Sequence, residues 1–330
     1  MQKKDIGLFV LILVIGTTVA IINPRFLSPI NIANTANLIG LFGLFSLAEA
    51  FVIITAGIEL SVGSVIALLG VVFVDLVVNV GVPWPVAIVL VVVAGGVIGT
   101  VHGFLVTRMG LQPFIVTLCG LLVYRGIARF YTKDATAGFV FGQTFPTLEW
   151  VTTGRTFGVP HSVMAFAIAA VVAWIVLHRS VFGRHLYAIG KNERAARYSG
   201  IRTGRVIVMA YVICGTLTAL SAVFFAMYTR SISPASHGNF YELYAIAAAV
   251  LGGFSLRGGE GSVMGVVLGV ILLQVLQNLV NLLGIPSSLN FAVMGTVILV
   301  GVVADQQFAR YREWRRSTAL AARSHSDGMA

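Results

Sequence analysis

Residues 183–205 read GRHLYAIGKNERAARYSGIRTGR and form a long, strongly charged stretch in an otherwise apolar chain. Seven Lys and Arg side chains lie between Arg179 and Arg205. Such a segment must lie in water, and the positive-inside rule places it in the cytoplasm. The whole chain is 58% hydrophobic and 10% charged, whereas a soluble domain is roughly 45–50% apolar and about 25% charged. The composition therefore predicts a protein that crosses the membrane several times.

Apolar segments of near-spanning length follow one another along the chain, since a helix needs about 17–25 residues to cross a bilayer. They cover residues 6–23, 37–56, 62–81, 84–106, 113–131, 160–178, 205–228, 241–256, 262–284 and 287–303. An even number puts both termini on one side, and Lys3, Lys4 and the Arg310–Arg316 cluster mark that side as cytoplasmic. We expect an all-α integral membrane protein, a polytopic bundle of about ten transmembrane helices with broken, Gly-interrupted segments.

The transmembrane domain is expected to cover residues 1–307, followed by a basic cytoplasmic tail, 308–330, that is partly disordered. Residues 1–23 resemble a signal peptide, but the long apolar core and poor cleavage site indicate a retained first span. The net charge of +10 reflects topology rather than nucleic-acid binding, because 16 of the 22 Lys and Arg fall on the predicted cytoplasmic side, near membrane lipid. Cys119 and Cys214 lie in apolar runs, and neither a disulfide framework nor metal-binding spacing is visible.

The junction Gly57–Ser64 holds a carboxylate, Glu59, between two apolar segments joined by almost no loop. Ionisable groups at such depth are expensive and usually face a cavity, a partner group or water. Glycines let the backbone turn there, and Ser61 and Ser64 can satisfy freed backbone groups or cap the next helix. Glu59 can itself act as a cap, because the helix dipole favours an acid at an N-terminus. Glu49, in the preceding segment, could hold a proton or cation, or hydrogen-bond a neighbouring helix.

Two stripes of small residues predict close helix packing: Gly95, Gly99 and Gly103 form one, and Gly261, Gly265 and Gly269 form the other. His102, beside the first stripe, is expected to hydrogen-bond another helix rather than to bind a ligand. Arg125 and Arg129 share a helix face because they lie four residues apart. We expect them to anchor their segment at the outer headgroups, with the lining of an outer vestibule as the alternative.

The polar loop is predicted to contain a short amphipathic helix over Asn192–Ser199, capped by Asn192 and ended by Gly200. Ala195, Ala196 and Ser199 give this helix a small-residue face that could enter a groove of another protein. The alternative is a helix that rests on anionic lipid. Lipid contact would explain the Lys and Arg residues but would not require the small face.

Four stretches together resemble the permease subunits of bacterial ABC importers for sugars, of the ribose, xylose and arabinose type: Gly57–Ser64, Pro113–Gly120, Ala188–Ile201 and Leu251–Gly261 (LGGFSLRGGEG). The resemblance implies a non-enzymatic pore subunit of the bacterial inner membrane, with no catalytic or metal site. It implies pairing with a second permease, a copy or a paralogue, and with cytoplasmic ABC ATPase subunits that bind ATP and Mg, so this chain would hold no cofactor. A periplasmic sugar-binding protein would deliver the cargo.

The resemblance also assigns roles to residues. Those that couple the chain to the ATPase, in the loop 179–205, are Gly190, Asn192, Glu193, Ala195, Ala196, Ser199, Gly200 and Ile201. Those that line or gate the translocation path are Glu59, Ser61, Gly63, Pro113, Phe114, Thr117, Gly252, Gly253, Gly258, Gly259 and Asn278. The chain departs from the family at Glu59, where Asp is usual, and at Lys191, where a small residue is common. The longer acid keeps the charge but changes its reach.

The leading hypothesis is an alternating-access permease for a pentose or related monosaccharide. In it, closure of the ATPases moves the Asn192–Ser199 helix and, through it, the flanking segments 160–178 and 205–228. One alternative is an ion-coupled secondary transporter that uses Glu49 or Glu59 as a proton site. Another is a related ABC permease for amino acids or nucleosides. An intramembrane enzyme would need clustered catalytic groups, and the sequence contains no such cluster.

Overall fold

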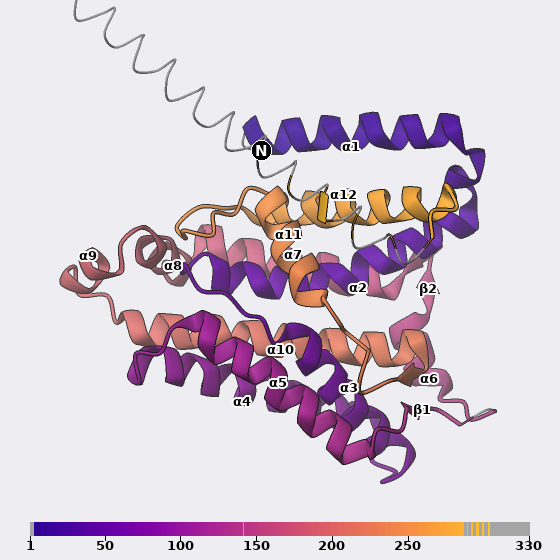
Figure 1. The fold of residues 1–330 in the computed structure, drawn as a ribbon, viewed down its shortest axis with the longest axis horizontal. Helices are drawn as coiled ribbons and strands as arrows, with labels where there is room; N and C mark the ends of the chain where they lie inside the picture. The colour runs from indigo at the N-terminus through magenta and orange to yellow at the C-terminus, as the bar shows by residue number, and fades with distance from the viewer. Residues whose placement is uncertain are drawn as a thin grey trace, which may run out of the picture. The chain divides into compact units, whose positions relative to one another are not determined.

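The computed structural model describes residues 3–140 and 142–286, together with Leu289, Ala292, Gly295, Thr296, Leu299 and Val303. Residues up to Leu283 form one compact unit of helices (Figure 1). The helices are α1 (Lys3–Ile22), the 3-10 turn η1 (Pro24–Leu27), α2 (Pro29–Ile53), α3 (Val62–Val78), α4 (Trp84–Arg108), α5 (Pro113–Thr132), α6 (Pro146–Thr153), α7 (His161–Arg179), α8 (Val181–Lys191), α9 (Glu193–Tyr198), α10 (Thr203–Thr229), α11 (Tyr241–Leu251) and α12 (Val263–Leu282). The predicted all-α class is confirmed.

Strands occur in the described part of this unit only as two-residue pairs at its loops. The strand β1 (Ala137–Gly138) pairs antiparallel with β4 (Ser231–Ile232). The strand β2 (Arg155–Thr156) pairs antiparallel with β3 (Val159–Pro160). These pairs fix loops in place and add no layer to the helical fold.

Seven of the described helices are long and apolar enough to cross a membrane: α1, α2, α4, α5, α7, α10 and α12. The helices α3 and α11 are apolar but shorter, with 17 and 11 residues. A protein with several membrane-crossing helices is therefore confirmed, whereas the predicted count of ten is not. The predicted span 287–303 lies largely outside the described residues, as do the basic tail 308–330 and the predicted domain boundary at 307.

Glycines on α4 explain why it packs closely on α10. A Cβ atom added at Gly99 would lie 2.1 Å from the carbonyl oxygen of Tyr211, and one at Gly95 would lie 2.3 Å from that of Gly215. Gly103 likewise faces α10, at the backbone of Val208. Backbones approach this closely only where side chains are absent, which is how small residues drive association in membranes. The first predicted stripe is confirmed.

The second predicted stripe is only partly helical. Gly265 and Gly269 lie on α12 and pack against the end of α11, where a Cβ at Gly265 would lie 1.8 Å from the oxygen of Gly252. Gly261 is not part of this helix, because α12 begins at Val263, after the N-cap Ser262. Gly261 instead has φ +143° and lies against a phenylalanine ring of the preceding loop. The glycine spacing predicted the contact but placed the helix start too early.

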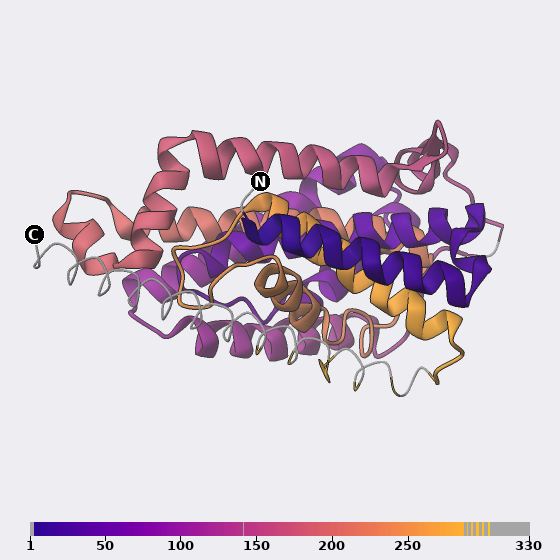
Figure 2. The same cartoon turned by 90° about the horizontal axis from the view of Figure 1, so that it is seen from above.

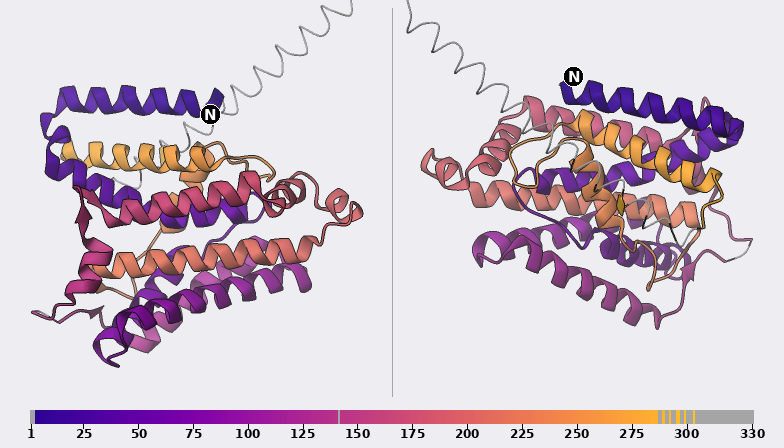
Figure 3. Two further views of the ribbon diagram at one scale, coloured as in Figure 1. Left: turned by 180° about the vertical axis from the view of Figure 1, so that it is seen from behind. Right: turned by 45° about the horizontal axis from the view of Figure 1, so that its top comes forward.

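The two ends of the unit differ in character. The helices α8 and α9 lie at one end, whereas α6, β1 and β2 lie at the opposite end (Figures 1 and 3). Seen from above, α9 projects beyond the neighbouring helices (Figure 2). The loop between α5 and α7 contains α6 and the short strands β1, β2 and β3, and no helix longer than α6 in its described part. The predicted coupling loop and the loop between α5 and α7 are thus at opposite ends (Figures 1 and 3).

The core lies where α2, α10 and α11 meet. Residues 40–53 of α2 are all buried, and aromatic rings from the three helices pack beside them. Phe45 stacks on Tyr241 with ring centroids 5.5 Å apart, and Phe225 contacts both rings. Such offset and tilted pairs stabilise a core beyond the apolar area that they bury. The broken segment that carries Glu59 follows directly after the buried end of α2.

Candidate functional site

A break in regular structure separates α2 from α3. Residues 57–61 have neither helix nor strand hydrogen bonding. The turn into the break is sharp, because Ala56 has φ +64°, in the left-handed region that L side chains rarely adopt. Such a backbone carries unpaired polar groups that must be satisfied inside the protein. The residues around the break supply those partners.

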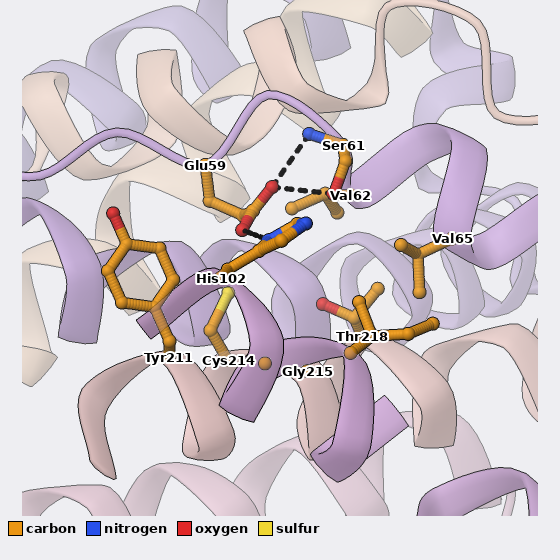
Figure 4. Close-up of a pocket in the computed structure, with 11 residues that line it drawn as sticks. Glu59, Ser61, Val62, Val65, His102, Tyr211, Cys214, Gly215 and Thr218 are labelled. Carbon is orange, nitrogen blue, oxygen red and sulfur yellow. Dashed lines mark hydrogen bonds and ion pairs between the residues drawn. The ribbon is translucent and has the colours of Figure 1, made fainter. Parts of the chain in front are cut away.

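Glu59 is the centre of a buried hydrogen-bond network (Figure 4). Its Oε1 accepts hydrogen bonds from the backbone N of Ser61 at 2.8 Å and from the Ser61 hydroxyl at 2.6 Å. Its Oε2 lies 2.6 Å from Nδ1 of His102 on α4. The other ring nitrogen of His102 lies 2.9 Å from the hydroxyl of Tyr124 on α5. A neutral imidazole that donates to the carboxylate and accepts from the phenol satisfies both contacts.

This geometry decides between the sequence interpretations. The interpretation of His102 as a hydrogen bonder between helices is confirmed. Capping was one of two interpretations for Ser61, but its side chain makes no capping bond within the described structure and donates to Glu59 instead. Ser64 does satisfy a freed backbone group, because its hydroxyl donates to the Ser61 carbonyl at 2.8 Å. Glu59 therefore ties the break to α4, and it reaches α5 through the histidine.

Glu49, on α2, forms a hydrogen bond with the backbone of the break. Its Oε1 accepts the backbone N–H of Glu59 at 3.1 Å, and the residue is fully buried. Its Oε2 has no hydrogen-bond partner among the described residues. Of the two sequence interpretations for Glu49, hydrogen bonding to a neighbouring segment is the one that the geometry realises. A carboxyl oxygen left without a partner in the core is costly.

A small cavity lies beside this network. It has a volume of about 10 Å³ and is bounded by Glu59, His102, Tyr211, Cys214 and Thr218, among others (Figure 4). The Tyr211 hydroxyl is buried and lacks a partner in the described part of the chain. A cavity of this size holds about one water, whereas pockets for small molecules measure about 300–1,000 Å³. The cavity suits a water that completes the network, and the bundle is closed to larger solutes at this point.

The start of α5 also forms a hydrogen bond with the break. The Thr117 hydroxyl lies 3.2 Å from the carbonyl oxygen of Ile58 and 3.0 Å from that of Pro113. Gly63, just after the break, packs so closely that an added Cβ would lie 1.9 Å from the Gly238 oxygen. Phe114 does not join this group, because its side chain is 52% exposed on the outside of the unit. The predicted path residues Glu59, Ser61, Gly63, Pro113 and Thr117 thus gather around one break.

The remaining predicted path residues lie elsewhere. Gly252 caps the end of α11 and faces α12, and the N–H of Gly253 donates to the Val250 carbonyl. Gly258 and Gly259 lie at the other side of the same loop, against α8. The Asn278 amide pairs with that of Asn31 through bonds of 3.0 and 2.8 Å, which join α12 to α2. The predicted path residues therefore lie at several contacts between helices, and their role in translocation stays a prediction.

Arg125, for which the sequence suggested a headgroup anchor or the lining of an outer vestibule, bonds to a loop. Its guanidinium donates to the carbonyl oxygens of Pro234 and His237, at 3.0 and 2.6 Å. It therefore holds the loop between β4 and α11 rather than the headgroups. Arg129, one turn further along α5, is exposed and pairs with Asp134 at 2.6 Å. That hydrogen bond lowers the pKa of the Asp134 carboxyl.

The predicted coupling helix is present as α9. The Asn192 side chain accepts the Ala195 backbone N–H at 3.0 Å, and Gly200 ends the helix with φ +85°. Ala196 was expected on the exposed small face, but it is 5% exposed and points into the protein. Tyr198, by contrast, is 92% exposed. The free face therefore combines the small Ala195 with the large Tyr198.

The rest of the predicted coupling group keeps α9 attached to the bundle. Glu193 accepts hydrogen bonds from Arg197 and from Thr203 at the start of α10, each at 3.0 Å. Ser199 is exposed and bonds within the helix, and the Ile201 N–H donates to the Ala196 carbonyl. Gly190 lies at the end of α8 against Ile54 and Gly259. The coupling loop thus meets the loop after α11, which the sequence did not suggest.

Sequence reasoning missed the partners that complete these contacts. Tyr124 ends the Glu59 network, Tyr187 donates to the Gly261 carbonyl at 2.8 Å, and Glu260 pairs with Lys191 at 2.5 Å. Tyr124 and Tyr187 carry no local pattern that sets them apart from other tyrosines. Glu260 gave a usable signal, because it is the single acid in the Gly-rich stretch 251–261. The only other charged residue in that stretch is Arg257.

Comparisons with known proteins reveal relatives along nearly the whole chain. The family model described as branched-chain amino acid transport system / permease component matches residues 31–302. The chain is 39% identical to the ribose import permease protein of Bacillus subtilis (strain 168), over 93% of this chain and 94% of that one. It is 36% identical to the ribose import permease protein of Escherichia coli (strain K12), over 93% and 94%. It is 32% identical to the D-allose transport system permease protein of that strain, over 92% of each. No solved structure matches the chain significantly.

Proposed function

Since the chain belongs to the family of branched-chain amino acid transport system permease components, we propose that it is the membrane-spanning permease subunit of an ABC importer for a pentose or related monosaccharide. The observation that carries this proposal is the identity of 32–39% to ribose and allose permeases over nine-tenths of the chain. The family description refers to amino acids, but the relatives named above are sugar permeases. We therefore favour a sugar as cargo.

The proposed assembly contains partners that do the work this chain does not do. ATP and Mg would bind to separate cytoplasmic ATPase subunits, and a periplasmic sugar-binding protein would deliver the cargo. A second permease, a copy or a paralogue, would complete the path through the inner membrane, and both termini would be cytoplasmic. The arrangement of α8 and α9 supports this proposal, because they project at the end opposite to α6 (Figure 2). An ATPase can reach α9 there without contacting the loops on the other side.

The Glu59 break is the proposed gate region. Its carboxylate is buried and fully engaged, and the adjacent cavity is too small for a sugar. We infer a closed path in this conformation, which opens when α2 and α3 separate at the break. Few charges line the helices, which agrees with a permease whose selectivity is supplied by the binding protein.

The test is uptake by proteoliposomes that contain the permease, its cognate ATPase and its binding protein. We expect uptake of labelled ribose that requires ATP inside and binding protein outside. Competition with unlabelled allose, xylose and leucine then defines the cargo class. Uptake without ATP under a pH gradient would instead establish an ion-coupled transporter, and displacement only by leucine would establish an amino-acid permease.

The coupling role of α9 has a sharper test than the sequence alone allowed. Ala195→Trp places a large ring on the exposed face of α9, and we expect it to abolish binding-protein-stimulated ATP hydrolysis. Ala167→Trp is the matched control, because Ala167 is exposed on α7, away from α9, and should have no effect. Intact stimulation in Ala195→Trp would refute the assignment of α9 as the docking helix.

A further inference from the structure

Two loops meet without side chains between them at the end of the bundle near α9. Gly190 of α8 presents its bare Cα to the loop between α11 and α12, where an added Cβ would lie 2.2 Å from the backbone N of Gly259. The same Cβ would lie 2.0 Å from the carbonyl oxygen of Ile54. Gly258 completes the contact, since a Cβ there would lie 2.7 Å from the backbone N of Ala56. Both loop glycines also have positive φ, +80° and +71°, which other residues rarely adopt.

Side chains strengthen the contact on its α8 side. The Lys191 ammonium lies 2.5 Å from the Glu260 carboxylate, with both side chains 58% exposed. The Tyr187 hydroxyl donates to the Gly261 carbonyl at 2.8 Å. Burial raises the pKa of Tyr187 to about 12, so this donor keeps its proton at any physiological pH. The loop is therefore fastened to α8 at successive residues, 259, 260 and 261.

The opposite side of the loop is fastened to the end of α2. The Gly259 N–H donates to the Ile54 carbonyl at 2.8 Å. Ile54 follows the last residue of α2 and lies five residues before Glu59. A single residue, Gly259, therefore contacts both the segment before the predicted coupling helix and the segment that leads into the break.

We propose that the loop Ser255–Gly261 transmits the movement of the coupling helix directly to the Glu59 break, with Gly190, Gly258 and Gly259 as positioning residues. The inference rests on the proposed function, and it adds a route that does not pass through the flanking helices α7 and α10. Where two backbones are in direct contact, no flexible side chain lies between them to absorb a displacement. Packed interiors therefore transmit strain. A shift of α8 therefore displaces Ile54–Ala56, and the break that begins at Gly57 shifts with it.

The experiment compares glycine variants in the reconstituted complex. Gly259→Ala puts a methyl 2.7 Å from the backbone N of Lys191 at a left-handed φ. We expect it to keep binding-protein-stimulated ATP hydrolysis but to import about 10-fold less sugar per ATP. A tenfold change corresponds to about 1.4 kcal/mol. Gly204→Ala is the matched control, because its Cβ would meet nothing closer than 3.6 Å at the other end of the coupling loop. It should retain the wild-type ratio.

A charge reversal decides the matter if Gly259→Ala fails to fold. Lys191→Glu opposes two carboxylates at the contact, and we expect sugar per ATP to fall about 3-fold, within the range for an exposed ion pair. The double variant Lys191→Glu/Glu260→Lys should restore the ratio, which a purely structural role of Lys191 would not predict. An unchanged ratio in Lys191→Glu, or in a folded Gly259→Ala, overturns the proposal.

A readout without sugar separates this proposal from the proposed function. Hydrogen exchange is measured across residues 54–61 with and without the bound ATPase, in wild type and in the Lys191→Glu variant. We expect ATPase binding to change exchange at 54–61 in wild type and to change it at least 3-fold less in the variant. Equal responses refute the transmission route even if the wild-type complex imports sugar. If the wild-type complex imports no sugar but its exchange at 54–61 still responds more strongly than that of the variant, only the cargo assignment is refuted.

Discussion

Removing His102 tests how far the buried Glu59 carboxylate depends on its hydrogen-bond partner. His102→Phe keeps the size of the ring but leaves Oε2 of Glu59 without its 2.6 Å contact, in a side chain that is 6% exposed. A buried carboxylate oxygen that loses its hydrogen-bond donor costs about 2–3 kcal/mol. The Tyr124 hydroxyl also loses its acceptor, which adds about 1 kcal/mol. We expect the variant to lose about 3–4 kcal/mol of its free energy of unfolding.

A second substitution separates charge from packing. Glu59→Gln keeps the shape and the acceptor for Ser61 and should cost about 1–2 kcal/mol by itself. In the double variant the buried charge is gone, so Glu59→Gln should partly rescue His102→Phe instead of adding to it. Equilibrium unfolding in SDS-containing mixed micelles gives the free energies, and Thr100→Val, on the exposed face of α4, is the control. Additive losses in the double variant, or a loss below about 1 kcal/mol in His102→Phe, would refute this electrostatic account.

Three further predictions concern packing and loops. Gly99→Ala should lose about 1–3 kcal/mol in the same unfolding assay because its Cβ would lie 2.1 Å from a carbonyl oxygen, whereas Gly96→Ala, 3.2 Å from a methyl group, should lose less. Arg125→Gln should speed hydrogen exchange and proteolysis in the loop after β4, because two carbonyls lose their donor. The hydrogen bond from Arg230 lowers the pKa of the Glu149 carboxyl from 4.5. The stability that this bond contributes is therefore present above pH 4.5 and is lost as the pH falls through the lower pKa of the folded state. Glu149→Gln should therefore reduce the free energy of unfolding at pH 7 by less than about 1 kcal/mol, and the difference from wild type should shrink as the pH falls below 4.5.

Local features were predictable because their causes lie within a few residues. Asn192 caps α9 and Gly200 ends it as predicted, since the cap bond spans three residues and the left-handed turn needs only its own glycine. The glycine spacing of α4 likewise predicted a close helix contact. It did not identify α10 as the partner, because spacing describes one surface of a pair.

Contacts between distant segments were not predictable in this way. Ala196 lies on the same short helix as the exposed Ala195, but Glu193 bonds to Thr203 and turns that face toward the bundle. Arg125 shares a helix face with Arg129, yet a loop more than 100 residues later covers it. Periodicity predicts which residues share a face. Which face meets protein is decided by the tertiary fold.

The same distinction applies to the candidate site. The sequence predicted that Glu59 would be special, because a carboxylate between apolar segments needs a partner. The partner histidine lies 43 residues away and its tyrosine a further 22. Only a rigid pairing of α4 and α5 brings the three together, and no local pattern records it. A local pattern can also suggest a position that the fold does not give. Phe114 lies in a predicted path motif, yet its side chain is exposed on the outside of the unit.

The energetics of the Glu59 network constrain how a gate at this break can move. Separating Glu59 from His102 during transport would cost about 2–3 kcal/mol at every cycle, because a buried carboxylate oxygen would lose its donor. A movement that keeps the break, α4 and α5 together avoids that cost, because Glu59, His102 and Tyr124 then stay bonded. The displacement must therefore fall at the other end of the break, where the strained Ala56 and the bond from Gly259 to Ile54 lie. That end is where the loop from α8 arrives, so the contact that receives the push coincides with the contact that is least costly to change.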